Sequence, residues 1–192
     1  YEISTDTAKE ITLPKDKDLF ILSATEIKAP CECKCATELY DRVKKRKFDF
    51  KIKGLKSKLN FVTNFNVSVG WRWQYVGVFE TVYEGVKFYF IDNEYYFKRE
   101  GNIYGFYDDG ERFAFFSRAA LDTIARLDIY PDILHCNDWQ TAGSIIYLKG
   151  MYFGDEKFRK IKTVFTIHNI EYQGKFSMDS FESLFGFSEN LR

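Results

Sequence analysis

The feature that most constrains the fold is a strand, helix, strand pattern between residues 132 and 167. Asp132–Cys136 and Lys162–Ile167 are short strand candidates, and Thr163–Ile167 is a run of β-branched and apolar residues that is typical of a buried strand. Thr141–Lys149, between them, has the composition of a helix. Two strands joined through a helix pair in parallel with a right-handed crossover. The pattern therefore predicts an α/β fold, with a Rossmann-like parallel sheet and flanking helices.

Three strands and a long helix are expected ahead of this unit. The strands lie between residues 61 and 91 and form a β-hairpin excursion from the parallel sheet. Tyr83-Glu84-Gly85 is typical of a hairpin turn, because glycine can take a positive φ. Glu111–Leu127 is expected to be a helix, since its apolar residues recur at spacings of three and four along one buried stripe. Ser180–Phe185 is expected to be a short helix.

Composition excludes several classes of partner. Hydrophobic residues make up 45% of the chain, which is enough for a sizeable core. Lys plus Arg and Asp plus Glu each number 28, whereas a nucleic-acid-binding protein usually has a basic excess. No apolar stretch approaches the length of a membrane span, and no secretory leader opens the chain. We therefore expect no nucleic-acid or membrane partner and a cytoplasmic location.

Residues 1–52 differ in texture from residues 53–192, and we treat them as a separate tail, replaced segment or fused part. Leu19–Leu22 is a short strand candidate within them. Three cysteines, Cys31, Cys33 and Cys35, form a C-x-C-x-C run, whereas zinc sites usually contain C-x₂-C pairs. We favour ordinary reduced thiols here; an added metal-binding or interaction module is the alternative.

Polar residues gather at the carboxyl ends of both strands of the strand, helix, strand unit. The first group is HCNDWQT at residues 135–141, and the second is HNIEYQG at residues 168–174. Ligands of open parallel sheets bind beyond the carboxyl ends of the strands. If the two strands are neighbours, both groups face one crevice. Their imidazole, carboxylate and amide side chains are suited to a hydroxyl-rich ligand.

Several of these residues also have a structural interpretation. Asn137 or Asp138 could simply cap the following helix, because Asn and Asp are preferred at that position. His135 falls inside a strand, so we expect a hydrogen-bonded core histidine rather than a ligand-binding residue. His168, at a strand end, is better placed to reach solvent or substrate. Gly174 fits a close approach of the backbone to another group.

Aromatic residues are dense in residues 93–99 and 101–110, where they alternate with charged residues. Exposed aromatic rings of this kind could form a platform that stacks against sugars. A packed loop beneath the helix that starts near Glu111 is the alternative. Composition does not separate the two.

Five segments, in order, resemble the N-terminal domain of bacterial glycogen synthases and of the related starch synthases. The similarity runs from about residue 53 to about residue 187. The segments are GWRWQYVGVFE, YFIDNEYYFKR, YDDGERFAFFSRAAL, PDILHCNDWQTA and TVFTIHNIEYQGKF. This resemblance implies the N-terminal half of a GT-B glycosyltransferase. It also implies retaining transfer of glucose from ADP-glucose to the non-reducing end of an α-1,4-glucan, without a metal or another cofactor.

The resemblance also implies roles for individual residues. His168 would lie beside the transferred glucose as a positioning group, and Asp138 is the second expected catalytic residue. The expected substrate-binding residues are Asn137, Trp139, Gln140, Asn169, Gln173 and Tyr104. Tyr104 would contact the glucan chain.

Two parts of the family pattern are not found in this sequence. The Lys-Thr-Gly-Gly loop, which contacts the nucleotide sugar in the family, does not occur. The C-terminal Rossmann domain is also absent, so we expect this chain alone to be inactive. A non-catalytic α-glucan-binding domain is the alternative function.

Overall fold

The computed structural model describes residues 19–22, 59–83, 86–99, 104–177 and 179–187. The cysteine run at residues 31–35, and Glu84 and Gly85 of the expected turn, lie outside the described residues. The division of the chain at residue 52 stays a prediction.

A three-stranded parallel sheet holds the predicted strand, helix, strand unit. Its strands are β1 (Leu19–Leu22), β5 (Ile133–Asn137) and β6 (Lys162–Thr166), in the spatial order β1-β5-β6. Both neighbouring pairs are parallel, and α4 (Trp139–Gly150) and α5 (Glu156–Lys160) lie between β5 and β6 in the sequence. The predicted parallel pair is confirmed, and so is the strand at residues 19–22.

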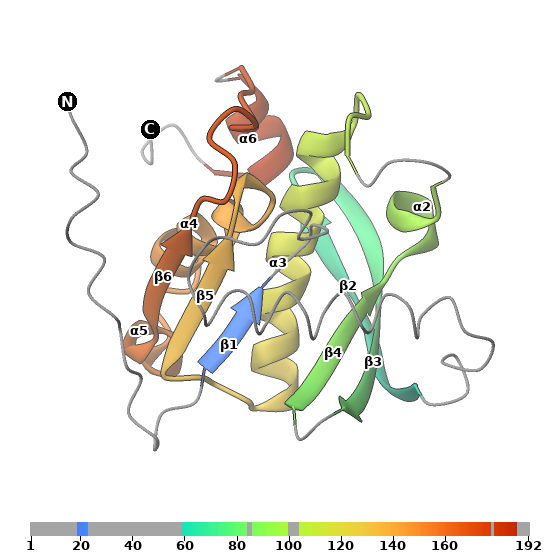
Figure 1. Ribbon diagram of the computed structural model, residues 1–192, viewed down its shortest axis with the longest axis vertical. Helices are drawn as coiled ribbons and strands as arrows, with labels where there is room; N and C mark the ends of the chain where they lie inside the picture. The colour runs from blue at the N-terminus through green and yellow to red at the C-terminus, as the bar shows by residue number, and fades with distance from the viewer. Residues whose placement is uncertain (1–18, 23–58, 84–85, 100–103, 178, 188–192) are drawn as a thin grey trace.

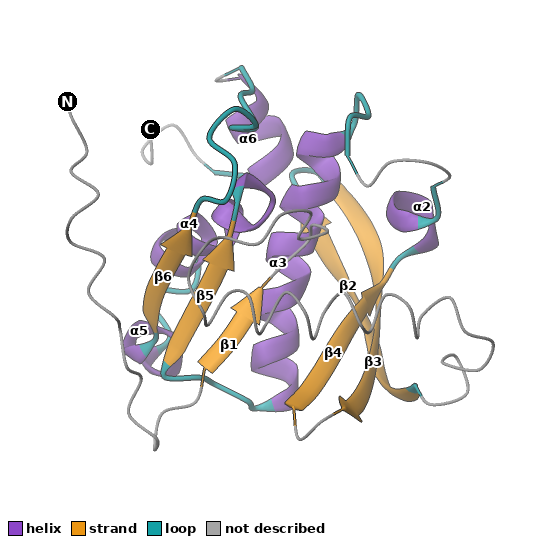
Figure 2. Ribbon diagram, viewed as in Figure 1, coloured by secondary structure: helices purple, strands orange, loops and turns teal. Residues whose placement is uncertain are grey.

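A separate antiparallel sheet contains β2 (Asn60–Val69), β3 (Arg72–Tyr83) and β4 (Val86–Asp92), in sequence order. The predicted excursion is therefore a sheet of its own. The long helix α3 (Asp109–Leu127) lies between the two sheets (Figure 1). It starts two residues earlier than the periodicity predicts. Figure 2 shows how the strands of the two sheets flank this helix on opposite sides.

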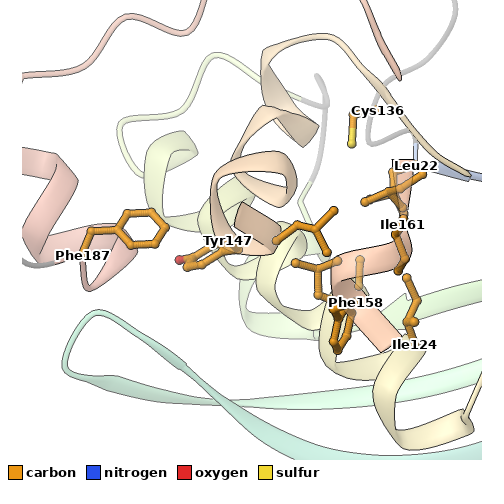
Figure 3. Close-up of a cluster of buried hydrophobic side chains, with 11 residues drawn as sticks. Leu22, Ile124, Cys136, Tyr147, Phe158, Ile161 and Phe187 are labelled. Carbon is orange, nitrogen blue, oxygen red and sulfur yellow. The ribbon is translucent and has the colours of Figure 1, made fainter. Parts of the chain in front are cut away.

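Each sheet has its own hydrophobic cluster against α3. Under the parallel sheet, the buried side chains include Leu22, Ile124, Cys136, Tyr147 and Phe158 (Figure 3). Burial raises the pKa of the Cys136 thiol to about 12, so this cysteine is a core residue rather than a nucleophile. The second cluster packs the antiparallel sheet on the other side of α3, with Phe65, Val67, Val69, Val76, Val78, Ala114 and Phe115 among its members.

Two short helices were not expected from periodicity. These are α2 (Glu94–Phe97) and α5, and each begins with a side-chain cap: Asn93 accepts a hydrogen bond from the Tyr96 N–H, and Asp155 from the Lys157 N–H. The predicted helix near residue 180 is α6 (Asp179–Phe185). No helix among the described residues combines the length and the apolar composition needed to cross a membrane.

Candidate functional site

The carboxyl ends of β5 and β6 lie side by side, as the sequence predicts for the two polar groups. Asn137 is in register with Thr166. Just beyond, the Asp138 N–H donates to the Thr166 carbonyl oxygen at 2.8 Å. The loop that enters α4 and the loop that leaves β6 therefore share one edge of the sheet.

Asp138 has an unusual backbone conformation at this edge. Its φ of 57° and ψ of 174° fall in a region that almost only glycine adopts, which costs about 1 to 3 kcal/mol. The residue stands at the start of α4, but its side chain makes no capping hydrogen bond. Instead Oδ1 accepts the backbone N–H of His168 at 2.7 Å. The capping interpretation is therefore wrong for this side chain, which joins the two loops.

The side chain of Asn137 is buried and does not cap α4 either. Its Nδ2 donates to the carbonyl oxygen of Leu22 on β1 at 3.0 Å. Its Oδ1 lies 2.9 Å from Nε2 of His168. Asn137 thus connects the edge strand of the sheet to the imidazole, while the rest of His168 is exposed.

His135 has the structural role expected of it. The ring is half-buried, and Nε2 lies 2.8 Å from Oγ1 of Thr166. Burial, and secondarily the charge of nearby His168, lower the pKa of His135 below its usual value of 6.5. His135 is therefore neutral at neutral pH.

This lowered pKa predicts a pH dependence of stability. The unfolded chain protonates His135 first as the pH falls below about 6.5, so the free energy of unfolding should decrease from there down to the folded-state pKa. Urea unfolding at about pH 7.5 and about pH 5.5 measures the difference, and His135→Gln should reduce it. An equal difference in the variant would contradict the assignment.

The loop after β6 packs against the side chain of Trp139. Gly174 has a φ of 58°, and a Cβ at this position would overlap the indole ring. Phe113 and Phe176 contact the same ring, with centroids 5.0 and 5.6 Å away. The predicted close approach at Gly174 is confirmed. Trp139 lies half-buried beneath the loop.

The remaining predicted residues lie around this edge with different degrees of exposure. Asn169 and Gln173 are exposed in the loop after β6, and Asn169 Oδ1 accepts the Glu171 N–H at 3.0 Å. Gln140 is buried in the first turn of α4, and its Oε1 has no hydrogen-bond partner among the described residues. Tyr104 packs edge-to-face against Tyr172, with centroids 5.8 Å apart, so the segment ahead of α3 also reaches the loop after β6.

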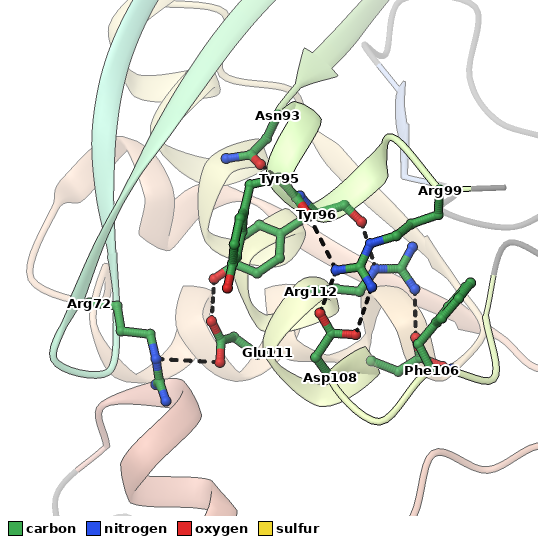
Figure 4. A network of polar contacts seen from close by, with 10 residues as sticks. Arg72, Asn93, Tyr95, Tyr96, Arg99, Phe106, Asp108, Glu111 and Arg112 are labelled. Atoms are coloured by element: carbon green, nitrogen blue, oxygen red, sulfur yellow. Dashed lines mark hydrogen bonds and ion pairs between the residues drawn. The ribbon is translucent and has the colours of Figure 1, made fainter.

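The buried Arg112, which was not predicted as a site residue, holds the segment ahead of α3, residues 104–108, in place (Figure 4). Arg112 is only 2% exposed, and its guanidinium lies 2.6 Å from Asp109 and donates to the Tyr96 carbonyl oxygen at 2.9 Å. The other oxygen of Asp109 accepts the N–H groups of Gly105 and Phe106. The signal in the sequence is the spacing of Asp and Arg by three residues at a helix start.

The aromatic cluster is mostly packed rather than laid out as a platform. Tyr96 is buried and donates to Glu111 Oε1 at 2.5 Å, and the ring of Phe97 lies 6.0 Å from that of Phe115. The packed interpretation is confirmed for these two residues. Tyr95 and Tyr107 are exposed, Tyr107 almost completely at 97%.

Metal ligands do not cluster in the described part of the chain. There, no group of three His, Cys, Asp or Glu residues is placed to hold a metal ion. The expected absence of a metal stays a prediction.

Comparisons with known proteins agree on one family. A family model described as the starch synthase catalytic domain matches residues 22–192. Glycogen synthase from Clostridium novyi is 55% identical over 129 residues, which are 67% of this chain and 27% of that protein. Glycogen synthase from Exiguobacterium sibiricum is 51% identical over 135 residues, which are 69% of this chain and 28% of that protein. The chain thus spans little more than a quarter of these relatives.

A solved structure extends the likeness to the fold. The catalytic domain of starch synthase IV from Arabidopsis thaliana, bound to ADP and acarbose, matches with a TM-score of 0.61 and 32% identity. The match covers 69% of this chain and 27% of that one. The expected α/β fold of a GT-B glycosyltransferase is confirmed. The chain belongs to the starch synthase catalytic domain family.

Proposed function

We propose that this chain supplies the N-terminal half of the active site of a retaining glucosyltransferase. The donor would be ADP-glucose, and the acceptor the non-reducing end of an α-1,4-glucan. The observation that carries the proposal is the junction of His168, Asn137 and Asp138 at the carboxyl edge of the parallel sheet, in a chain of this family. The starch synthase IV neighbour is bound to ADP and acarbose, which supports a nucleotide-containing donor.

The arrangement suits a transfer in which sugar hydroxyls are held by hydrogen bonds. Retaining transfer passes through a state with oxocarbenium character, which fixed dipoles and correctly placed groups stabilise. The imidazole of His168 is exposed, and the backbone N–H of the same residue donates to Asp138 Oδ1. Asn169 and Gln173 add exposed amides on the same loop. We assign His168 and Asp138 the catalytic positioning roles, and no metal is part of the proposal.

The proposal requires more protein than this chain. The chain covers about 27% of its relatives, and we expect the second Rossmann domain and most of the nucleotide site in the part it does not cover. We expect the chain alone to show no turnover with ADP-glucose and glycogen. A cytoplasmic location, where ADP-glucose would be available, is part of the same proposal.

Adding the remaining part of a relative tests the proposed function. Joining this chain to the segment of the Clostridium novyi glycogen synthase that follows the matched region should give measurable glucosyl transfer. In this joined protein, His168→Ala should lower kcat by about 10²- to 10³-fold, because a group that positions the reacting sugar is lost.

His135→Gln is the matched control, because it removes the other histidine of the chain at the same sheet edge. It should keep kcat within about threefold of the parent, as a change away from the reacting atoms does. If His168→Ala keeps the activity of the parent, the assignment of His168 is wrong.

The alternative, a non-catalytic α-glucan-binding domain, rests on the contact between Tyr104 and Tyr172 beside the same loop. Because Tyr96 and Phe97 are packed against α3, fewer rings are left for a sugar platform than composition predicts. Glucosyl transfer by the joined protein would decide against this alternative.

A further inference from the structure

We propose that Asn137 is a positioning residue that fixes the imidazole of His168 in the tautomer with the proton on Nε2. In the neutral ring, the Nδ1 atom of His168 is then a hydrogen-bond acceptor that faces the ligand. The tautomer follows from contacts within this chain. Only the identity of the ligand group, a sugar hydroxyl, rests on the proposed function.

The Leu22 carbonyl oxygen fixes the orientation of the Asn137 amide. One of its terminal atoms lies 3.0 Å from the carbonyl oxygen of Leu22. A carbonyl oxygen only accepts hydrogen bonds, so the atom facing it must be the NH₂ group. The opposite orientation would place two acceptor oxygens 3.0 Å apart in a buried site, where neither could be satisfied. The amide oxygen therefore points to His168.

The Asn137 amide oxygen in turn fixes the proton on the His168 ring. The amide oxygen of Asn137 also only accepts, and it lies 2.9 Å from Nε2 of His168. Nε2 must therefore carry a proton. In a neutral imidazole the other nitrogen has none, so Nδ1 carries a lone pair. The edge strand β1 thus sets the proton position on a residue of the loop after β6.

No described residue makes a hydrogen bond to Nδ1 of His168, and the side chain is exposed at the carboxyl edge of the sheet. The nearby Asp138 Oδ1 is occupied by the His168 backbone N–H. A free acceptor at Nδ1 selects a ligand that donates, and sugar hydroxyls donate. A phosphate oxygen, which only accepts, would be disfavoured at Nδ1.

Nitrogen-15 NMR of the intact chain tests the tautomer directly. The chain has only two histidines, so both rings can be assigned. Above the pH at which the rings titrate, His168 should give a protonated Nε2 and an unprotonated Nδ1, with no averaging between tautomers. Averaged ring shifts, or a proton on Nδ1, would overturn the proposal without any variant.

Two substitutions separate the role of Asn137 from a merely structural one. Asn137→Ala removes the acceptor, so the His168 shifts should become the averaged values of a free imidazole. Asn137→Asp keeps an acceptor oxygen for Nε2, so the Nε2 proton should persist, but its second oxygen faces the Leu22 carbonyl oxygen and should lower the free energy of unfolding. If a variant does not fold, the spectrum of the parent chain still decides the tautomer.

Thr166→Val is the matched control, because it removes the partner of His135 and leaves Asn137 intact. The His168 shifts should stay unchanged in this variant. If Asn137→Ala leaves the His168 shifts unchanged, Asn137 does not set the tautomer.

Adding ADP-glucose to the joined protein tests which ligand group Nδ1 binds. Acceptance of a hydroxyl hydrogen bond should shift Nδ1 of His168 and leave the Nε2 proton in place. His168 in the isolated chain could carry its proton on Nε2 while the joined protein shows no change in the Nδ1 chemical shift and no glucose transfer. In that case the proposed function fails and the role of Asn137 stands. If glucose is transferred while the parent ring is averaged, the role of Asn137 fails alone.

Discussion

Replacing Gly70 by alanine should detach α6 from the turn between β2 and β3. Gly70 has a φ of 56°, and a Cβ there would overlap the backbone oxygen of Ser183 in α6. Backbone atoms cannot rotate away as a side chain can, so either the turn or the helix must move. Strain and overpacking together should lower the free energy of unfolding by about 2 to 5 kcal/mol. Urea unfolding and hydrogen exchange of the α6 amides measure both effects.

Gly105→Ala is the matched control for this prediction. Gly105 also has a positive φ, 101°, but no described atom lies within 4 Å of an added Cβ. This variant should carry only the conformational strain, about 1 to 2 kcal/mol, and its α6 amides should keep their protection. Equal exchange of the α6 amides in both variants would show that the contact with Ser183 is not what holds the helix.

Replacing Arg112 by alanine should lower the free energy of unfolding by about 3 to 5 kcal/mol. The substitution leaves the buried carboxylate of Asp109 without its cation, and removing one partner of a buried ion pair is strongly destabilising. It also empties the space between the rings of Phe97, Phe106 and Phe113, each of which lies within 5.5 Å of the guanidinium carbon. Urea unfolding measures the loss.

Lys98→Ala provides the comparison with an exposed ion pair. Lys98 lies 2.9 Å from Glu94, but its side chain is 72% exposed and the pair is screened by solvent. This change should leave the free energy of unfolding almost unchanged. A loss below about 1 kcal/mol in Arg112→Ala would mean that solvent reaches Asp109 and that the network is not the support of the 104–108 segment.

The parts of the fold that follow from local pattern were predictable. The unit from β5 to β6 has a clear strand, helix, strand alternation, and the apolar residues of α3 recur at spacings of three and four. The short helices α2 and α5 are too brief for a periodic signal. Only their caps, Asn93 and Asp155, mark them in the sequence.

The site was predictable at a coarser level. The positions of His168 and Asp138 at strand ends follow from the pattern, and so does their convergence once β5 and β6 are neighbours. The hydrogen-bond partners of these two side chains do not follow from the sequence pattern. The choice of Asp138 to bind the His168 N–H instead of capping α4 depends on a backbone conformation that no propensity predicts for aspartate.

The pairing of β1 with β5 has a consequence for how the protein is made. Leu22 leaves the ribosome 115 residues before Asn137, its hydrogen-bond partner. At synthesis rates of about 5 to 20 residues per second, the first strand waits roughly 6 to 23 s for its neighbour. During that interval an apolar segment with unpaired backbone groups is open to wrong partners. The contact that orients the imidazole of His168 forms later still, because His168 is synthesised 31 residues after Asn137.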